Sequence, residues 1–184
     1  MINDTELIAR IVSRDDHHAF HCLVAKYQSG IRQLLRRLTA GDHHLADDLA
    51  QETFITLYKK IKSFRGDSAL NTWLHKIAYN HFLKSQQKAY KKYEQTECNF
   101  DDFEKSPHNA DKDLVIEKLM QQLSLPERTC ITLSISVGMS HVEISQVTDF
   151  PLGTVKSHLN RAQQKLKSFV ASSKIAGEKG EKHA

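Results

Sequence analysis

Residues 47–80 read DDLAQETFITLYKKIKSFRGDSALNTWLHKIAYN, and apolar residues recur every three or four positions on both sides of a single break. Leu49 and Leu57 belong to the apolar stripe before the break, and Leu70 and Leu74 belong to the stripe after it. This spacing lines up apolar side chains on one face of an α-helix. The glycine in the break, SFRGDS, supplies a turn. The stretch therefore predicts two amphipathic helices joined by a short loop.

The same helical period extends toward the N-terminus. It runs from Phe20 through Ile31 to Leu38. Gly41-Asp42 interrupts it, and the Asp42 carboxylate is suited to cap the helix that follows. Across the 184 residues, glycine and proline are scarce, at 7 and 3, which favours long helices over a turn-rich sheet protein. We expect an all-α protein.

Charge divides the chain into parts. Residues 94–113 lose the helical period and carry a net charge of −5, whereas residues 1–93 carry +6 and residues 114–184 carry +3. An acidic, aperiodic stretch between two basic, periodic stretches is typical of a linker. We therefore predict a helical domain over 1–93, a flexible acidic linker over 94–113, a second helical domain over 114–171 and a flexible tail over 172–184.

The second domain has the pattern of a helix-turn-helix. S-x-x-E capping boxes at Ser124–Glu127 and Ser140–Glu143 mark the starts of two helices. A turn over 149–153 then leads to a last helix that starts near Thr154. In a DNA-binding helix-turn-helix, the start of the second helix lies in the major groove, although the same geometry also occurs in purely structural domains.

A polar stripe at four-residue spacing continues along the helix that starts near Leu70. Its members are Lys76, Asn80, Lys84, Lys88 and Lys92. Like charges at this spacing destabilise a helix unless an anion faces them. The stripe is therefore a candidate phosphate-binding surface, and a solubilising surface is its alternative.

Two stretches carry a resemblance to a known family. Residues 47–80 resemble the core of region two of extracytoplasmic-function sigma factors. Residues 123–167 resemble region four of the same family and read LSLPERTCITLSISVGMSHVEISQVTDFPLGTVKSHLNRAQQKLK. The order of the two regions and the acidic linker between them also match, so the resemblance covers nearly the whole chain. It implies a sigma factor of bacterial RNA polymerase, which recognises promoters and catalyses no reaction itself.

The resemblance implies several protein partners. The acidic face of the helix that follows Asp42 would bind the β′ clamp of core RNA polymerase through Asp47, Asp48, Gln51 and Glu52, and the β flap is a further contact. An anti-sigma factor, often membrane-anchored, would mask the polymerase-binding faces until a stress or envelope signal arrives. The linker, with Asp101, Asp102 and Glu104, would mimic nucleic acid in a basic channel of polymerase.

The resemblance also implies two contacts with promoter DNA. A base flipped from the −10 element and its neighbouring phosphates would be held by Phe64, Arg65, Gly66, Asp67, Ser68, Ala69, Lys76, Asn80, Lys84 and Lys88. The −35 element would be read by Thr154, Lys156, Ser157, His158, Asn160 and Arg161. Trp73 is in register with Leu70 and Ile77, so we assign it to the core rather than to base stacking. Many relatives carry arginine or an aromatic residue in the reading helix, so promoter preference does not carry over.

The sequence offers little support for other classes of function. It contains no phosphate-binding loop, dinucleotide-binding glycine motif, nucleophile elbow or H-E-x-x-H, so we predict no enzyme and no cofactor. His17 and His21 have ligand-like spacing and adjoin Cys22, but no carboxylate or thiolate cluster completes a metal site. No apolar run approaches the roughly 18 residues of a membrane span, and no signal peptide is evident. We expect a cytoplasmic protein whose 3 cysteines are reduced.

Two alternatives stay open beside the sigma factor. One is a conventional helix-turn-helix regulator, which binds duplex DNA without polymerase. The other is a pure interaction protein, such as an adaptor of polymerase. Binding to free duplex DNA would favour the regulator, and dependence on core polymerase would favour the sigma factor.

Overall fold

The structure, a computed structural model, describes residues 3–94, 116 and 119–180, with side chains for 3–90, 116, 119–169 and 171. Within these ranges every regular element is a helix, which confirms the all-α prediction. The elements are α1 (Asp4–Arg14), α2 (His17–Leu38), α3 (His43–Lys60), the short 3-10 helix η1 (Ile61–Ser63), α4 (Leu70–Glu94), α6 (Leu125–Ile135), α7 (His141–Thr148) and α8 (Leu152–Gly180). The predicted linker, apart from Glu94, lies outside the described residues.

Side-chain caps determine where several helices begin. The Asp42 carboxylate accepts a hydrogen bond from the Leu45 backbone N–H at 2.9 Å, as the sequence predicts. At the start of α7, the Ser140 N–H donates to Glu143 Oε2 at 2.9 Å while the Glu143 N–H donates to Ser140 Oγ at 3.3 Å. These bonds satisfy N–H groups that have no partner within the helix.

Helices α1 to α4 form the first domain, in which α2 packs against α1, α3 and α4. The apolar stripes predicted from the sequence make its core, because Leu23, Ile31, Leu34, Leu57 and Leu74 are almost fully buried. Burying each such side chain contributes about 1.5–3 kcal/mol, so the core orients α3 and α4 and leaves their polar faces outward.

Helices α6, α7 and α8 form the second domain. Val155, Leu159 and Ala162 on α8 are buried, as are Ile131 on α6 and Ile144 on α7. The last helix begins at Leu152, two residues before the predicted start, because the Pro151 carbonyl accepts hydrogen bonds from the Thr154 and Val155 N–H groups. The backbone of α8 is helical as far as Gly180, past the predicted start of the tail at Ser172.

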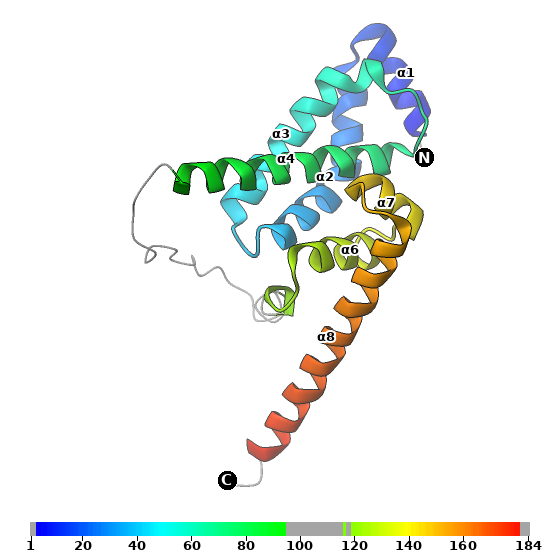
Figure 1. Cartoon of the computed structure of the whole chain (residues 1–184). Coiled ribbons are helices and arrows are strands. Elements are labelled where there is room, and N and C mark those ends of the chain that lie inside the picture. Colours follow the sequence, from blue (N-terminus) through cyan, green and yellow to red (C-terminus); the bar gives the residue numbers. More distant parts are fainter. Residues whose placement is uncertain (1–2, 95–115, 117–118, 181–184) are drawn as a thin grey trace.

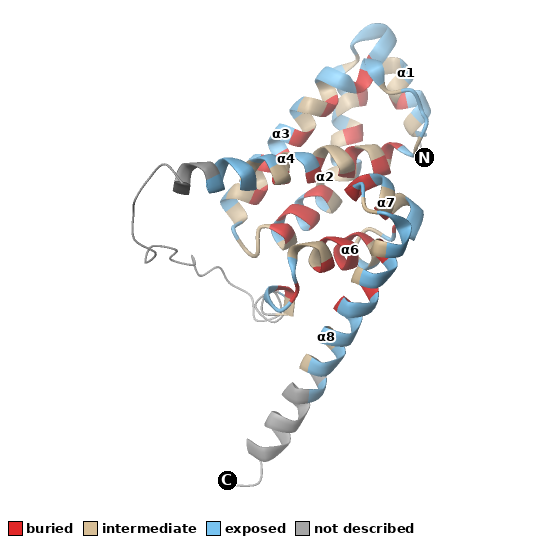
Figure 2. Cartoon of the chain, viewed as in Figure 1, coloured by how far each residue is buried: buried red, intermediate tan, exposed pale blue. Residues whose placement is uncertain are grey.

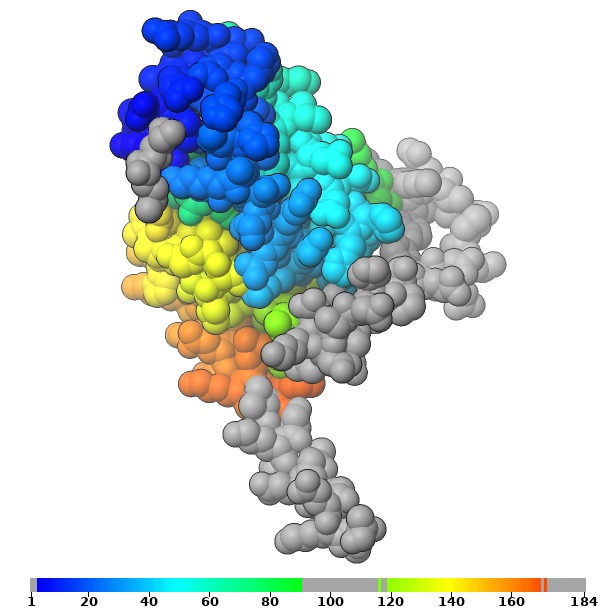
Figure 3. Space-filling view, turned by 180° about the vertical axis from the view of Figure 1, so that it is seen from behind, coloured from blue at the N-terminus to red at the C-terminus, as the bar shows by residue number. Residues whose placement is uncertain are grey.

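The two domains lie directly against each other, an arrangement that the sequence did not predict. Helix α6 packs on α2 and α7 packs on α4 (Figure 1). Buried residues occupy the facing sides of these helices (Figure 2), and the view from behind shows the second domain against α2 (Figure 3). Polar contacts that cross the interface among the described residues include Arg37 to Ser136 Oγ, Arg128 Nη1 to the Leu38 carbonyl at 3.4 Å, Thr72 Oγ1 to Glu143 Oε1 at 3.3 Å, and Lys76 Nζ to Asp149 Oδ1 at 2.7 Å.

Candidate nucleic-acid and protein interfaces

The helix-turn-helix presents a polar face at the start of α8. Asp149 ends α7 in the left-handed region at φ +60°, a conformation that Asp tolerates better than most residues, and this bend directs the chain into α8. Burial of Val155 and Leu159 on the inner face turns four of the predicted −35 residues outward: Lys156, Ser157, Asn160 and Arg161 are exposed. Their donors and acceptors suit base edges and phosphates.

His158 and Thr154, the other two predicted −35 residues, are half-buried. The His158 ring lies 5.5 Å from the Phe150 ring, centroid to centroid, and His158 Nδ1 is 3.2 Å from Arg161 Nη2. Burial, helped by the Arg161 charge, lowers the pKa of His158. His158 therefore packs against the turn and contacts Arg161, whereas Lys156, Ser157, Asn160 and Arg161 face solvent.

The loop between η1 and α4 contains the first predicted −10 residues. Gly66 has φ +78°, which glycine adopts without strain. Arg65, Gly66, Asp67 and Ala69 are exposed, and Ser68 is half-buried. Phe64 packs on Trp73 with ring centroids 5.1 Å apart. Trp73 is half-buried and packs against the core at its edge, with Phe64 beside it.

The residues of the polar stripe on α4 differ in their surroundings, because one of them contacts the second domain. Asn80, Lys84 and Lys88 are exposed. Lys76 instead pairs with Asp149 of the second domain at 2.7 Å. Asn80 lies ten residues after the start of α4, about 15 Å along the helix axis. The 64–69 loop and Asn80 can therefore contact the same nucleotide only if the loop bends toward Asn80.

The acidic face of α3 is partly engaged within the first domain. Asp48 and Gln51 are exposed. Asp47 Oδ1 lies 3.6 Å from Arg32 Nε and 3.9 Å from Arg36 Nη2. Glu52 Oε2 lies 3.2 Å from His81 Nδ1 on α4, and Thr56 Oγ1 is 2.8 Å from His81 Nε2. Burial lowers the pKa of His81, although Glu52 opposes this shift.

A groove beside this acidic face was not predicted. It has a volume of about 650 Å³, lies between α2 and α3, and is lined by apolar side chains that include Phe20, Phe54 and Tyr58. Ile55 lines it and is 53% exposed, so it adds apolar surface at the edge of the groove. Ile55 falls outside the buried stripe of α3, and this was the sequence signal that could have revealed the groove.

No three His, Cys, Asp or Glu side chains in the described ranges gather into a group that could hold a metal ion; Cys22 Sγ lies 3.8 Å from His18 Nε2. None of the helices within these ranges is both long and apolar enough to cross a membrane.

The fold and these surfaces define a two-domain helical protein with a DNA-binding helix-turn-helix, and comparison with known proteins specifies it further. Sigma-70 region 2 matches residues 23–92, and sigma-70 region 4 matches residues 113–166. An ECF RNA polymerase sigma-E factor of Salmonella typhimurium is 35% identical over 185 residues, which cover 92% of this chain and 95% of the relative. One from Haemophilus influenzae is 32% identical and covers 92% and 96%.

Solved structures agree with these relatives. The sigma factor RpoE of Bartonella quintana, in complex with the anti-sigma factor NepR, has a TM-score of 0.74 and 26% identity, over 83% of this chain and 96% of that one. CnrH, in complex with the cytosolic domain of CnrY, shares the fold with a TM-score of 0.69 and 22% identity, over 92% and 97%. This chain belongs to the extracytoplasmic-function family of RNA polymerase sigma factors. It is therefore a protein of transcription initiation, and a conventional regulator is not favoured.

Proposed function

We propose that this sigma factor binds core RNA polymerase through α3, binds the −10 element through the 64–69 loop and α4, and reads the −35 element with the start of α8. The observation that carries the proposal is the exposure of Lys156, Ser157, Asn160 and Arg161 on one face of a helix-turn-helix, in a chain whose other domain also exposes basic and amide side chains. Core polymerase would carry out the chemistry in the cytoplasm. The functional domains would span 1–93 and 114–171.

Polymerase binding would combine charge with an apolar contact. Asp48 and Gln51 are exposed next to the groove that Ile55 borders. A helix of the partner protein could place an apolar residue in this groove and basic residues beside Asp48. The apolar contact would contribute binding free energy, and the charge attraction would speed association. Asp47 and Glu52 would contribute less directly, because Arg32 and Arg36 lie beside the first and His81 beside the second.

Promoter binding requires the domains to separate. The −10 and −35 elements lie about 25 base pairs apart, or roughly 85 Å at 3.4 Å of rise per base pair. In the structure α7 packs directly on α4. The described arrangement would thus be a closed form, and binding to polymerase would hold the domains apart.

An anti-sigma factor is the partner that would stabilise a closed form. The similar RpoE of Bartonella quintana was crystallised with the anti-sigma factor NepR. By analogy, an anti-sigma factor of this protein would cover the α3 groove until a stress signal releases it.

Run-off transcription tests the proposal. Purified core polymerase is incubated with and without the protein on a pool of genomic fragments. We expect discrete new transcripts that share an upstream motif, and Gln51→Ala should reduce them at least fivefold through weaker polymerase binding, whereas Arg14→Ala should not. If transcripts do not change while the protein binds duplex DNA alone, the protein is a conventional regulator.

A further inference from the structure

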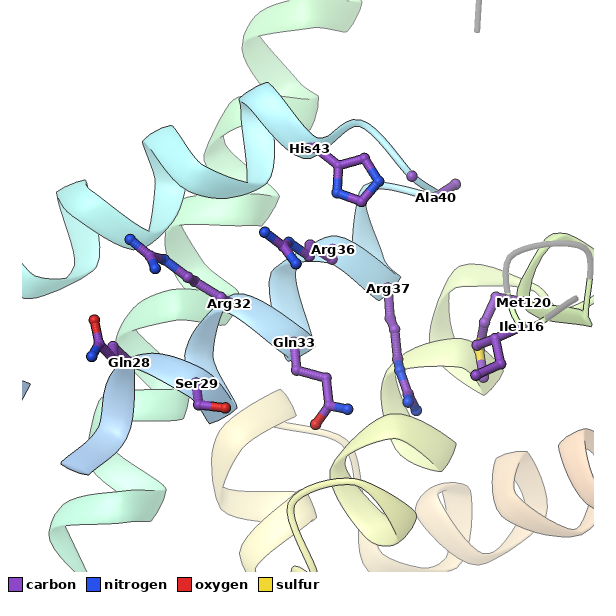
Figure 4. Close-up of a pocket in the computed structure, with 11 residues that line it drawn as sticks. Gln28, Ser29, Arg32, Gln33, Arg36, Arg37, Ala40, His43, Ile116 and Met120 are labelled. Atoms are coloured by element: carbon purple, nitrogen blue, oxygen red, sulfur yellow. The ribbon is translucent and has the colours of Figure 1, made fainter. Parts of the chain in front are cut away.

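A second hollow lies at the junction of the two domains. It has a volume of about 470 Å³, within the range of small-ligand sites. Figure 4 shows its walls: polar side chains from α2, His43 from α3, and the apolar pair Ile116 and Met120 from the second part of the chain. None of the predicted DNA-binding residues lines it.

Side chains on α2 that can donate hydrogen bonds line this hollow at regular intervals. Gln28, Arg32 and Arg36 follow one another at four-residue spacing, so their side chains stand one helical turn apart on the same face. In Figure 4 the Arg32 and Arg36 side chains both point toward α3, where His43 approaches Arg36. Two planar guanidiniums in this arrangement can hold a phosphate with several parallel hydrogen bonds.

The positive charge of these two arginines is only partly neutralised within the protein. Asp47 Oδ1 lies 3.6 Å from Arg32 and 3.9 Å from Arg36, beyond hydrogen-bond distance, and this buried oxygen accepts no hydrogen bond. One carboxylate faces two guanidiniums. A phosphate brings up to two negative charges and three acceptor oxygens, so it can satisfy donors that Asp47 does not reach.

Ile116 and Met120 form an apolar patch at the other end of the hollow, beyond Arg37 (Figure 4). Ile116 is 36% exposed, and Met120 lies beside it. An inorganic ion would leave this patch in water, whereas an organic group attached to the phosphate would cover it. The hollow therefore matches a ligand with an anionic end and a less polar end.

We propose that this hollow binds a small organic phosphate, with its phosphates on Arg32 and Arg36 and its organic part against Ile116. Because the walls come from both domains, the ligand binds the closed form more tightly than a form with separated domains. Occupancy therefore shifts the population toward the closed form. The binding step does not depend on the proposed promoter function.

Calorimetric titration of the full-length protein with ADP and with sodium pyrophosphate tests the site. We expect saturable binding with one site per chain, weaker at 200 mM than at 50 mM salt because the contacts are ionic. Arg36→Ala should weaken binding at least tenfold, and Arg36→Lys should weaken it less, since it keeps the charge but loses the planar fork. The control Arg14→Ala removes an exposed arginine at the end of α1 and should leave binding unchanged.

The outcomes separate the parts of the proposal. Tighter binding of ADP than of pyrophosphate supports contact with the apolar patch, and equal affinities overturn that contact. Equal affinity of the wild-type protein and Arg36→Ala for both anions overturns the site. Small-angle X-ray scattering should show a smaller radius of gyration with ADP bound, and an unchanged or larger radius overturns the bridging of the domains. No polymerase is present, so failure of these tests is distinct from failure of the sigma-factor proposal.

Discussion

At the scale of single residues, His75 is the least expected finding. Its side chain is 1% exposed, Nδ1 lies 2.8 Å from the Asn71 carbonyl, and Nε2 is buried without a hydrogen-bond partner. Burial lowers the pKa of His75. The neutral ring is therefore favoured in the folded protein, and protonation favours unfolding.

This burial predicts a pH dependence of stability. Above about pH 6.5, the pKa of an unfolded histidine, both states are neutral and stability is complete. As pH falls below 6.5, the unfolded chain takes up a proton that folded His75 does not, so the free energy of unfolding falls by at most about 1.4 kcal/mol per pH unit. Urea unfolding between pH 7.5 and 5 should show a shallower decline for His75→Leu. His81 and His158 remain in both proteins, so parallel declines would contradict the prediction.

Arg161 allows a second prediction at this scale. It is exposed on the reading face of α8, and its Nε donates to the Ser157 carbonyl at 3.3 Å. Arg161→Ala should weaken binding of the polymerase holoenzyme to −35 promoter DNA by about fivefold or more, since a base or phosphate contact is worth about 1–3 kcal/mol. Lys167→Ala, further along α8, serves as control. Equal losses for both variants in a filter-binding assay would exclude a specific role for Arg161.

At the scale of helices, Glu127 joins the start of α6 to α8. The Ser124 N–H donates to Glu127 Oε2 at 2.9 Å, and Lys165 Nζ on α8 donates to the same oxygen at 2.7 Å. Burial acts to raise the pKa of Glu127, but the bonds from Lys165 and Ser124 outweigh it and lower the pKa. Glu127→Ala should destabilise the second domain by about 2 kcal/mol through the lost cap and ion pair.

The measurement for this prediction is the urea midpoint of the far-UV circular dichroism transition. Glu127→Gln should lose less than Glu127→Ala, because the amide oxygen still accepts the Ser124 bond. The exposed Glu6→Ala on α1 is the control and should stay within about 0.5 kcal/mol of the wild-type protein. Equal losses for Gln and Ala would assign the effect to charge and exclude the cap.

At the scale of the whole molecule, the contact between domains determines which surfaces are free. Lys76 pairs with Asp149, and Thr72 donates to Glu143 on the same helix that Asp149 ends. Lys76→Glu should place like charges together and open the closed form, which changes the ratio of closed to open protein by about fivefold for each 1 kcal/mol lost.

Small-angle X-ray scattering checks this opening as an increase in the radius of gyration. Lys84→Glu is the matched control, because Lys84 is two turns further along α4, carries the same charge and is exposed. An increase in both variants would show that net charge, and not the domain contact, controls the dimensions.

What can be predicted from the sequence follows from short-range rules. The stripes that bury Leu57 and Leu74, the Asp42 cap and the Ser140–Glu143 box all join residues within a few positions of one another. The same periodicity turned Lys156 and Arg161 outward on α8. The family resemblance, which rests on these same stretches, led to the sigma-factor assignment.

Only the tertiary structure decided which of these side chains contact other parts of the protein and which are exposed to a binding partner. Lys76 pairs with Asp149, which lies 73 positions further along the sequence. His75 is buried, although it falls outside the apolar stripe of its helix. Ile55 opens onto a groove, and Arg32 and Arg36 share a hollow with Ile116. The physical reason is that helical periodicity determines which face of a helix points inward, whereas the packing of helices distant in sequence determines what each face meets.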